Sequence, residues 1–214
     1  MGKNYLFVLI LSIFMTSYSN AQDFSLGVKG GGSLNKMNFE NLSPDYQTDY
    51  GFSFGISGNY KFNQILSFET DLFIAQKGTK YDEPGVHYSY TLEYFFLPLL
   101  AKLYMPLDSD FNPHLDLGAS INFLVNNRMG YDLIIKPDGV YPLLPVPPSN
   151  YYTSETKSLD FGIIAGLGLD VKLFSHTISL ETRYEYGLTD INKGFGSGPV
   201  KNRTFSLLLG YLFY

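Results

Sequence analysis

The sequence predicts an all-β protein, an eight-stranded antiparallel up-and-down transmembrane β-barrel. Three observations support this: the composition, a repeated alternation of apolar and polar residues, and connections that alternate between long and short. Aromatic residues make up 17% of the 214 residues and charged residues only 16%. Aromatic side chains favour strands, and a soluble domain usually carries roughly 25% charged residues. The composition therefore favours strands with little surface in water.

Apolar and polar residues alternate with a period of two along the chain, which is the pattern of a strand with two different faces. We predict eight strands of about 10 to 13 residues, long enough to cross an outer membrane at a tilt. They centre on segments 24–34, 52–62, 66–77, 91–104, 115–125, 159–171, 178–188 and 205–213.

The connections between these segments alternate in length, as they do in outer-membrane barrels. The stretches 35–49, 78–90, 127–156 and 189–201 are long, whereas 63–64, 105–111 and 173–176 are short. We expect the short turns on the periplasmic side and the long loops outside the cell. A closed barrel also satisfies every backbone donor without water.

Charged side chains fall on one face of the strands, and we predict that this face lines the lumen. A charge at mid-strand on the lipid side would cost several kcal/mol, which also argues against a lipocalin-like inverted arrangement. The predicted polar network of the lumen consists of Glu69, Asp71, Lys102, Asp116, Glu181, Arg183 and Glu185. We interpret it as structural filling of a narrow barrel, with paired carboxylates for acid–base chemistry as the alternative.

The N-terminus predicts export. Lys3 precedes an apolar run from Tyr5 to Met15, and small residues lead to a cut after Ala21. A run of roughly 11 apolar residues is too short to span a ~30 Å membrane core. We therefore expect a cleaved signal peptide at 1–21, an outer-membrane β-barrel domain at 22–214, and localisation in the outer membrane.

Several kinds of chemistry find no support in the sequence. The absence of cysteine excludes disulfides, thiolate metal sites and lipoprotein acylation, and a net charge of −5 argues against nucleic acid. The three histidines show no metal-binding spacing. The run Gly30–Ser33 lacks the ending of a phosphate-binding loop. We expect no catalytic residue, no cofactor and no metal.

The long loop at 127–156 is the candidate partner site. Its Pro-rich core holds Tyr141, Pro142, Leu143, Leu144 and Pro145. An extended segment of this kind could dock a protein or a glycan, because connections of such length are usually functional or disordered. The alternative is a flap that folds over the barrel mouth.

Four segments resemble a known family. Leu66–Gly78, Leu92–Lys102, Asp160–Gly168 and Arg183–Leu188 are similar in order and spacing to strands of the PorT-like outer-membrane barrels common in Bacteroidota. The resemblance implies an eight-stranded barrel. It indicates function poorly, since one member serves type IX secretion and most have no assigned role.

Three functional hypotheses follow. The leading one is a non-enzymatic structural or partner-binding barrel, embedded in outer-membrane lipid and attached to an envelope or protein-secretion assembly. The alternatives are a narrow passive porin-like channel, which a crowded lumen disfavours, and an outer-membrane lipid-modifying enzyme, which would need a Ser/His or Asp/His cluster at the outer rim.

Overall fold

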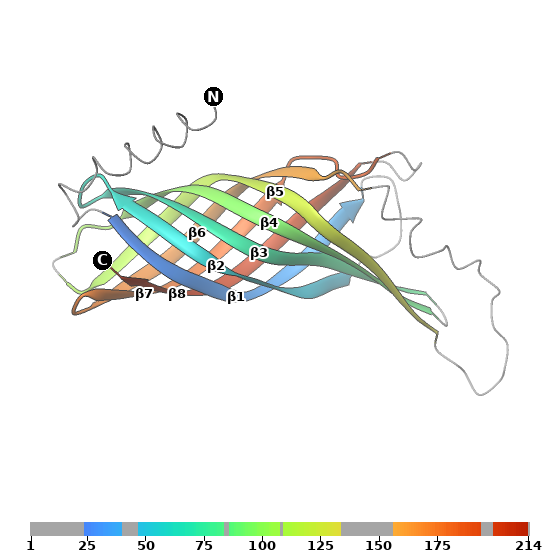
Figure 1. Cartoon of the computed structure of the whole chain (residues 1–214), viewed down its shortest axis with the longest axis horizontal. Coiled ribbons are helices and arrows are strands. Elements are labelled where there is room, and N and C mark those ends of the chain that lie inside the picture. Colours follow the sequence, from blue (N-terminus) through green and yellow to red (C-terminus); the bar gives the residue numbers. More distant parts are fainter. Residues whose placement is uncertain are drawn as a thin grey trace, which may run out of the picture.

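The computed structural model describes residues 24–39, 47–83, 86–107, 109–133, 156–193 and 199–213. Eight strands form one closed antiparallel barrel in chain order (Figure 1). They are β1 (Phe24–Phe39), β2 (Gln47–Lys61), β3 (Leu66–Glu83), β4 (Val86–Tyr104), β5 (Phe111–Leu133), β6 (Leu159–Leu173), β7 (His176–Gly187) and β8 (Val200–Phe213). The last strand pairs with the first, from Leu26↔Phe213 to Phe39↔Val200. The predicted eight-stranded antiparallel barrel is confirmed.

The two ends of the barrel differ. The connections 62–65, 105–110 and 174–175 lie at one end, which we call the turn end, together with the start of β1 and the finish of β8. The opposite end, the loop end, holds the tip of the β3–β4 hairpin (Figure 1). Among the residues that the structure describes, no helix is long and apolar enough to cross a membrane.

The strands are longer than predicted, with 12 to 23 residues instead of about 10 to 13. The stretch 78–90, predicted as a long loop, is a hairpin whose pairing continues from Lys77↔Leu92 to Glu83↔Val86. β5 likewise continues to Leu133, into the predicted 127–156 loop. Alternation marks only the part of a strand that separates an apolar face from a polar one. The hydrogen-bonded ladder can continue without it.

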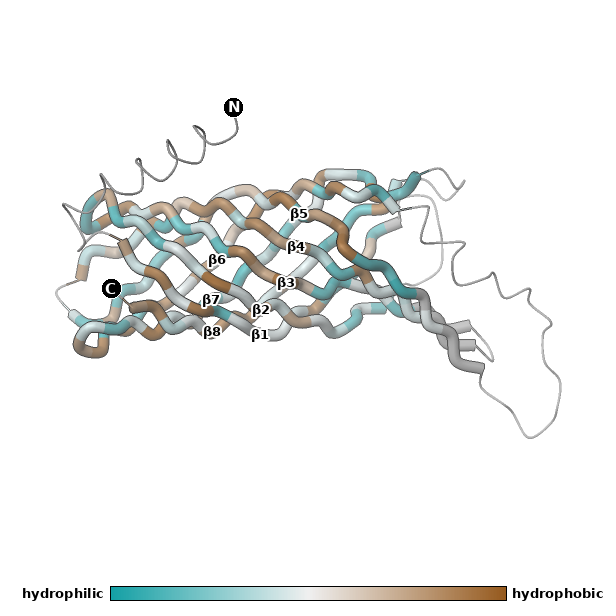
Figure 2. Tube along the Cα trace, viewed as in Figure 1, coloured by the Kyte–Doolittle hydropathy of each residue, from teal (hydrophilic) through white to brown (hydrophobic). Residues whose placement is uncertain are grey.

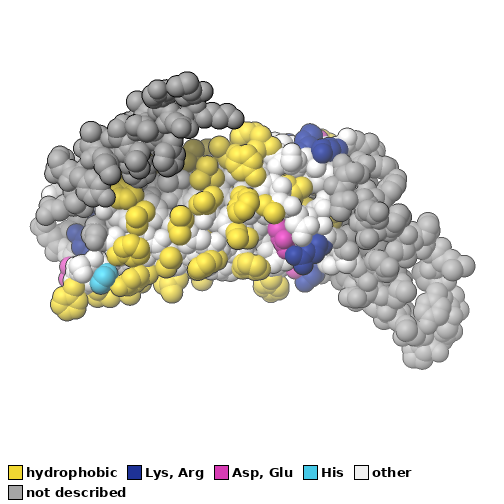
Figure 3. Space-filling model, viewed as in Figure 1, with side chains coloured by type: hydrophobic (Ala, Val, Ile, Leu, Met, Phe, Trp, Pro, Cys, Tyr) yellow, Lys and Arg dark blue, Asp and Glu magenta, His cyan; other side chains and the backbone are white. Residues whose placement is uncertain are grey.

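The outer face of the barrel is apolar around its middle. Along β8, Phe205, Leu207, Leu209 and Tyr211 point outward and are exposed, while the residues between them are buried. The same alternation on the other strands produces an apolar band, of which Figure 3 shows one face (Figures 2 and 3). Such a surface is costly in water and favourable in lipid, so the fold has the exterior of a membrane-spanning barrel.

Inward-facing glycines let neighbouring strands approach closely. A Cβ built on Gly31 would lie 1.9 Å from the carbonyl oxygen of Leu207 on β8, a distance that no side chain can occupy. The next residue, Gly32, points outward, and a Cβ there would meet no atom within 4 Å. The two adjacent glycines therefore have different roles, and only the inward one is required by packing.

Candidate functional site

The middle of the lumen holds a compact group of three cations and three carboxylates, which we call the central ion cluster. Its members are Lys29 on β1, Glu69 and Asp71 on β3, Lys102 on β4, and Glu181 and Arg183 on β7. Every one of these side chains is at most 3% exposed. The six formal charges cancel, which is the condition under which ions can be buried at tolerable cost.

Glu181 and Glu69 each contact all three cations of the cluster. Oε1 of Glu181 lies 2.6 Å from Nζ of Lys29 and 2.9 Å from Nζ of Lys102, and Arg183 donates to its Oε2. Oε1 of Glu69 lies 2.5 Å from Lys29 and 2.6 Å from Arg183, and its Oε2 lies 3.0 Å from Lys102. Asp71 accepts from Nη1 of Arg183 at 2.6 Å. The strands β1, β3, β4 and β7 are thus tied together across the lumen.

Two of the seven predicted lumen residues lie outside this cluster. Glu185 lies further toward the loop end, where Nζ of Lys77 is 2.6 Å from its Oε2. Ser120 and Asn122 donate to the other oxygen of Glu185 at 2.7 and 2.9 Å. Glu185 therefore forms a second, separate ion pair with its own hydrogen bonds.

Asp116 lies on the other side of the cluster, toward the turn end. Its Oδ1 lies 2.7 Å from Nδ1 of His114, and its Oδ2 is 3.9 Å from Nε of Arg183. The other ring nitrogen of His114 lies 3.4 Å from Oδ1 of Asp170, and Tyr104 donates to Oδ2 of Asp170 at 2.8 Å. His114 therefore belongs to the lumen network, between two carboxylates, on the same polar face of its strand as Asp116.

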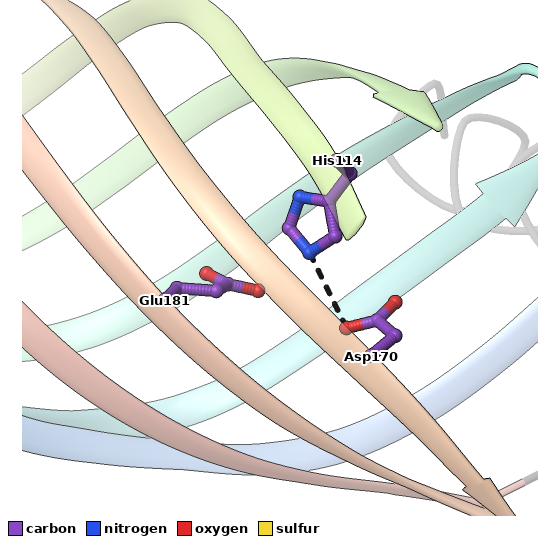
Figure 4. Close-up of side chains that lie close together, drawn as sticks. All are labelled: His114, Asp170 and Glu181. Atoms are coloured by element: carbon purple, nitrogen blue, oxygen red, sulfur yellow. Dashed lines mark ion pairs between the residues drawn. The ribbon is translucent and has the colours of Figure 1, made fainter. Parts of the chain in front are cut away.

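His114, Asp170 and Glu181 also lie close enough together to suggest a cation site. One ligand atom from each lies within 4.8 Å of the others, and all three residues are buried (Figure 4). Both oxygens of Glu181 are, however, already engaged by Lys29, Lys102 and Arg183. A divalent ion here would face three cations at short range. The group is better suited to ion pairing than to metal binding.

Lys29 is a central member of the cluster that the sequence did not assign to the lumen. It lies on β1, where Gly27, Gly30, Gly31 and Gly32 interrupt the apolar alternation. The sequence did offer one signal: Lys29 is an even number of residues from Ser25 and Ser33, which places all three on the same face of the strand. All three are buried in the lumen.

Apolar side chains close the lumen at the loop end. This group, which we call the lumen cap, consists of the buried residues Met37, Leu92, Tyr94, Ile191 and Val200. They come from β1, β4, the connection after β7, and β8. None is more than 6% exposed. The lumen is therefore filled by the central ion cluster, by the lumen cap at the loop end, and by a further buried apolar group of Phe73, Ala75, Phe96, Leu100, Ile164 and Leu208.

Other predicted features lie outside the described residues. These are the signal peptide at 1–21 and the candidate partner residues Tyr141, Pro142, Leu143, Leu144 and Pro145.

A closed barrel with an apolar exterior and an ionic interior is the architecture of an outer-membrane protein. The chain belongs to the outer membrane protein β-barrel domain family, which matches residues 20–193, and this membership places it in the outer membrane. No curated protein matches the sequence.

The chain is similar to solved structures of outer-membrane proteins. Neisserial surface protein A is similar over 89% of this chain and 96% of its own, with a TM-score of 0.52 and 19% identity. OprG from Pseudomonas aeruginosa covers 90% of this chain and 97% of its own, with a TM-score of 0.45 and 15% identity. The outer membrane enzyme PagL is similar over 85% of this chain and 97% of its own, with a TM-score of 0.36 and 11% identity. At 19% identity, the likeness to neisserial surface protein A concerns the fold alone.

Proposed function

We propose that this protein is a non-enzymatic, non-conducting outer-membrane scaffold that binds a partner in an envelope or protein-secretion assembly. We further propose that it is a PorT-like barrel of the kind found in Bacteroidota, exported by a signal peptide at 1–21. The observation that carries the proposal is the closed lumen, with the central ion cluster in the middle and the lumen cap at the loop end.

A passing solute would have to open both the central ion cluster and the lumen cap. In the middle it would have to break charge-assisted contacts such as Lys29–Glu69 at 2.5 Å and Lys102–Glu181 at 2.9 Å. Separating one partner from a buried ion pair costs about 3–5 kcal/mol. At the loop end it would have to displace apolar side chains that exclude water. Both requirements oppose passive transport.

Conductance in planar bilayers tests the proposed absence of a pore. The wild-type protein is expected to give no stepwise current. A variant that empties part of the cap, Met37→Ala with Tyr94→Ala, serves as a comparison for leakage through a loosened lumen. Large, uniform single-channel steps from the wild-type protein would contradict the proposal.

The proposed partner surface lies where β3, β4 and β5 extend beyond the other strands (Figure 1). β5 pairs with β6 only as far as Phe123↔Leu159, whereas its pairing with β4 continues to Val86↔Leu133. Among the described residues, β5 therefore has a one-sided ladder beyond Leu124. An edge of this kind can accept a strand from another protein, and the loop with Tyr141 to Pro145 follows it directly in the chain.

Site-specific photocrosslinking in native membranes tests this surface. A crosslinker at Asn126, which is exposed on the extended part of β5, is expected to capture an envelope protein. The same crosslinker at Ile56, on the apolar band, serves as the control and should yield lipid adducts only. Equal protein capture at both positions, or none at Asn126, would count against a partner at this edge.

Lipid A mass analysis tests the non-enzymatic part of the proposal. Cells that express the protein are expected to show the same lipid A species as cells without it. A new deacylated or acylated species would instead indicate a lipid-modifying enzyme.

A further inference from the structure

Three cations lie together on the outward face of the barrel at the loop end. Lys36 on β1 is the direct cross-strand partner of Arg203 on β8, and Lys201 lies on the same face of β8, two residues before Arg203. They follow directly after the cross-strand pair of Leu34 and Phe205, which belongs to the apolar band. On the face shown in Figure 3, Lys and Arg side chains, with some Asp and Glu, lie past the end of the apolar band. The three cations therefore lie at the level of lipid headgroups.

Arg203 is held in place without a carboxylate. Its Nη1 donates to the carbonyl oxygens of Gly187 and Asn202, both at 2.8 Å, and its Cζ lies 3.5 Å from the centre of the Tyr186 ring. Within the described part of the chain, no carboxylate oxygen comes within 4.0 Å of its guanidinium. The ring and the two carbonyls fix the side chain, and Nη2 and Nε make no hydrogen bond to a described residue.

Three further cations near this end each lie close to a carboxylate. Nζ of Lys80 lies 2.7 Å from Oδ1 of Asp49, and Nη2 of Arg128 lies 2.5 Å from Oε1 of Glu93. Nζ of Lys157 lies 3.5 Å from Oδ2 of Asp190. Arg203 instead has a cation, Lys36, directly opposite on the next strand. Two cations side by side concentrate positive charge at this point of the rim, which attracts an anionic ligand.

The apolar surface beside these cations has room for a hydrocarbon chain. The outward positions of β1 below Leu34 are Gly32 and Gly30, and a Cβ on Gly32 would meet no atom within 4 Å. Gly32 is four residues from Lys36, which is about 13 Å along a strand. A ligand with a phosphate at one end and acyl chains at the other matches this sequence of surfaces.

We propose that Lys36, Lys201 and Arg203 bind the phosphate groups of a phosphorylated outer-leaflet glycolipid, whose acyl chains lie along β1 over Gly32. Arginine suits this ligand because its planar guanidinium binds two phosphate oxygens at once. Lysine adds charge without fixed geometry. The site has a positioning role for lipid and requires no chemistry, so it is independent of whether the barrel binds a protein partner.

Native mass spectrometry of the full chain in detergent tests the site. The probes are bisphosphorylated lipid A and the same lipid A with both phosphates removed. The wild-type protein is expected to retain the phosphorylated probe at least tenfold more tightly than the other. Each cation near a lipid surface contributes about a fivefold factor, so K36Q/K201Q/R203Q should weaken retention by roughly a hundredfold. Arg203→Lys should weaken it less, because the charge remains.

The matched control is K80Q/R128Q/K157Q, which removes the same charge near the same end of the barrel but elsewhere around it. This variant should retain the phosphorylated probe as the wild-type protein does. Heat-modifiable gel mobility checks that both triple variants are folded. Equal retention by the two triple variants would overturn the proposal, and so would equal retention of the two probes. Displacement of the lipid by millimolar inorganic phosphate would also overturn it, because the site would then take free phosphate.

Discussion

Neutralising Glu181 tests whether the central ion cluster is a dry, balanced set of charges. Glu181→Gln keeps the size and shape of the side chain and removes one negative charge. The cluster would then hold Lys29, Lys102 and Arg183 against Glu69 and Asp71, with one uncompensated positive charge. All of these side chains are at most 3% exposed, so water cannot replace the lost partner.

The expected loss of stability is about 3–5 kcal/mol, the usual cost of breaking a buried ion pair by removing one partner. Hydrogen bonds to charged groups contribute about 1.5–3 kcal/mol each, and Glu181 accepts from Lys29, Lys102, Ser179 and Arg183. The loss stays below a simple sum because a glutamine oxygen still accepts some of these bonds. It is large compared with a total stability of about 5–15 kcal/mol.

Urea unfolding of the protein in phospholipid vesicles measures this change, and tyrosine fluorescence reports it because the chain has no tryptophan. Glu93→Gln is the matched control. Glu93 also pairs with an arginine, at 2.5 Å, but both side chains are partly exposed, and such pairs contribute about 0–1 kcal/mol. The double variant Glu181→Gln with Lys102→Met restores equal numbers of positive and negative charges and should recover about 1–2 kcal/mol.

Two results would refute this reasoning. One is a loss for Glu181→Gln no larger than that for Glu93→Gln, which would mean that water reaches the cluster. The other is strict additivity in the double variant, which would mean that the charges do not depend on one another.

Further predictions concern packing and the loop end. Gly31→Ala should impair folding because its Cβ would collide with the backbone of β8, whereas Gly32→Ala should fold normally; loss of heat-modifiable mobility in both or in neither would contradict this. Asp190→Asn should loosen the connection after β7, because Asp190 accepts backbone N–H bonds from Asn192 and Val200, and hydrogen exchange there should rise while the barrel stays protected. Burial acts to raise the pKa of Asp190, but these hydrogen bonds and Lys157 outweigh it and lower the pKa below its ordinary 3.8. The carboxylate therefore supports this connection fully above that value and loses the effect as pH falls through the lower folded pKa. A hydrogen-exchange profile of the connection that does not change with acidification, once corrected for intrinsic exchange, would contradict the assignment.

The sequence predicted the barrel because the lipid imposes a visible pattern. Residues such as Phe205 and Leu207 must be apolar where they meet lipid, and their neighbours must not be, so the alternation reveals the strand and its outward face. Beyond the apolar band this constraint ends, and the ladder from Gly78 to Glu83 was predicted as a loop.

Contacts between side chains in the lumen were harder to predict from the sequence. The alternation along the strands places Glu69, Lys102 and Glu181 inside the barrel, but it does not give the position of each along the barrel axis. The position along the axis depends on the stagger between strands. This stagger places Glu69 beside Lys29, although the two are 40 residues apart in the sequence. Glu185 could not be separated from the cluster on parity alone, since it shares a face with Glu181. The lumen cap had no signal, because its members lie where alternation fades.

The ion cluster also constrains how the barrel can be assembled. Lys29 and Glu181 are 152 residues apart and lie on the first and the seventh strand. Until those strands are brought into one ring, Lys29 and Glu181 cannot contact each other, and an open sheet would present incompletely paired charges to hydrocarbon. Partly inserted intermediates are therefore expensive, and completion of the ring is strongly favoured once the last strands arrive. The same contacts that close the lumen therefore favour an insertion in which the strands close into the ring together.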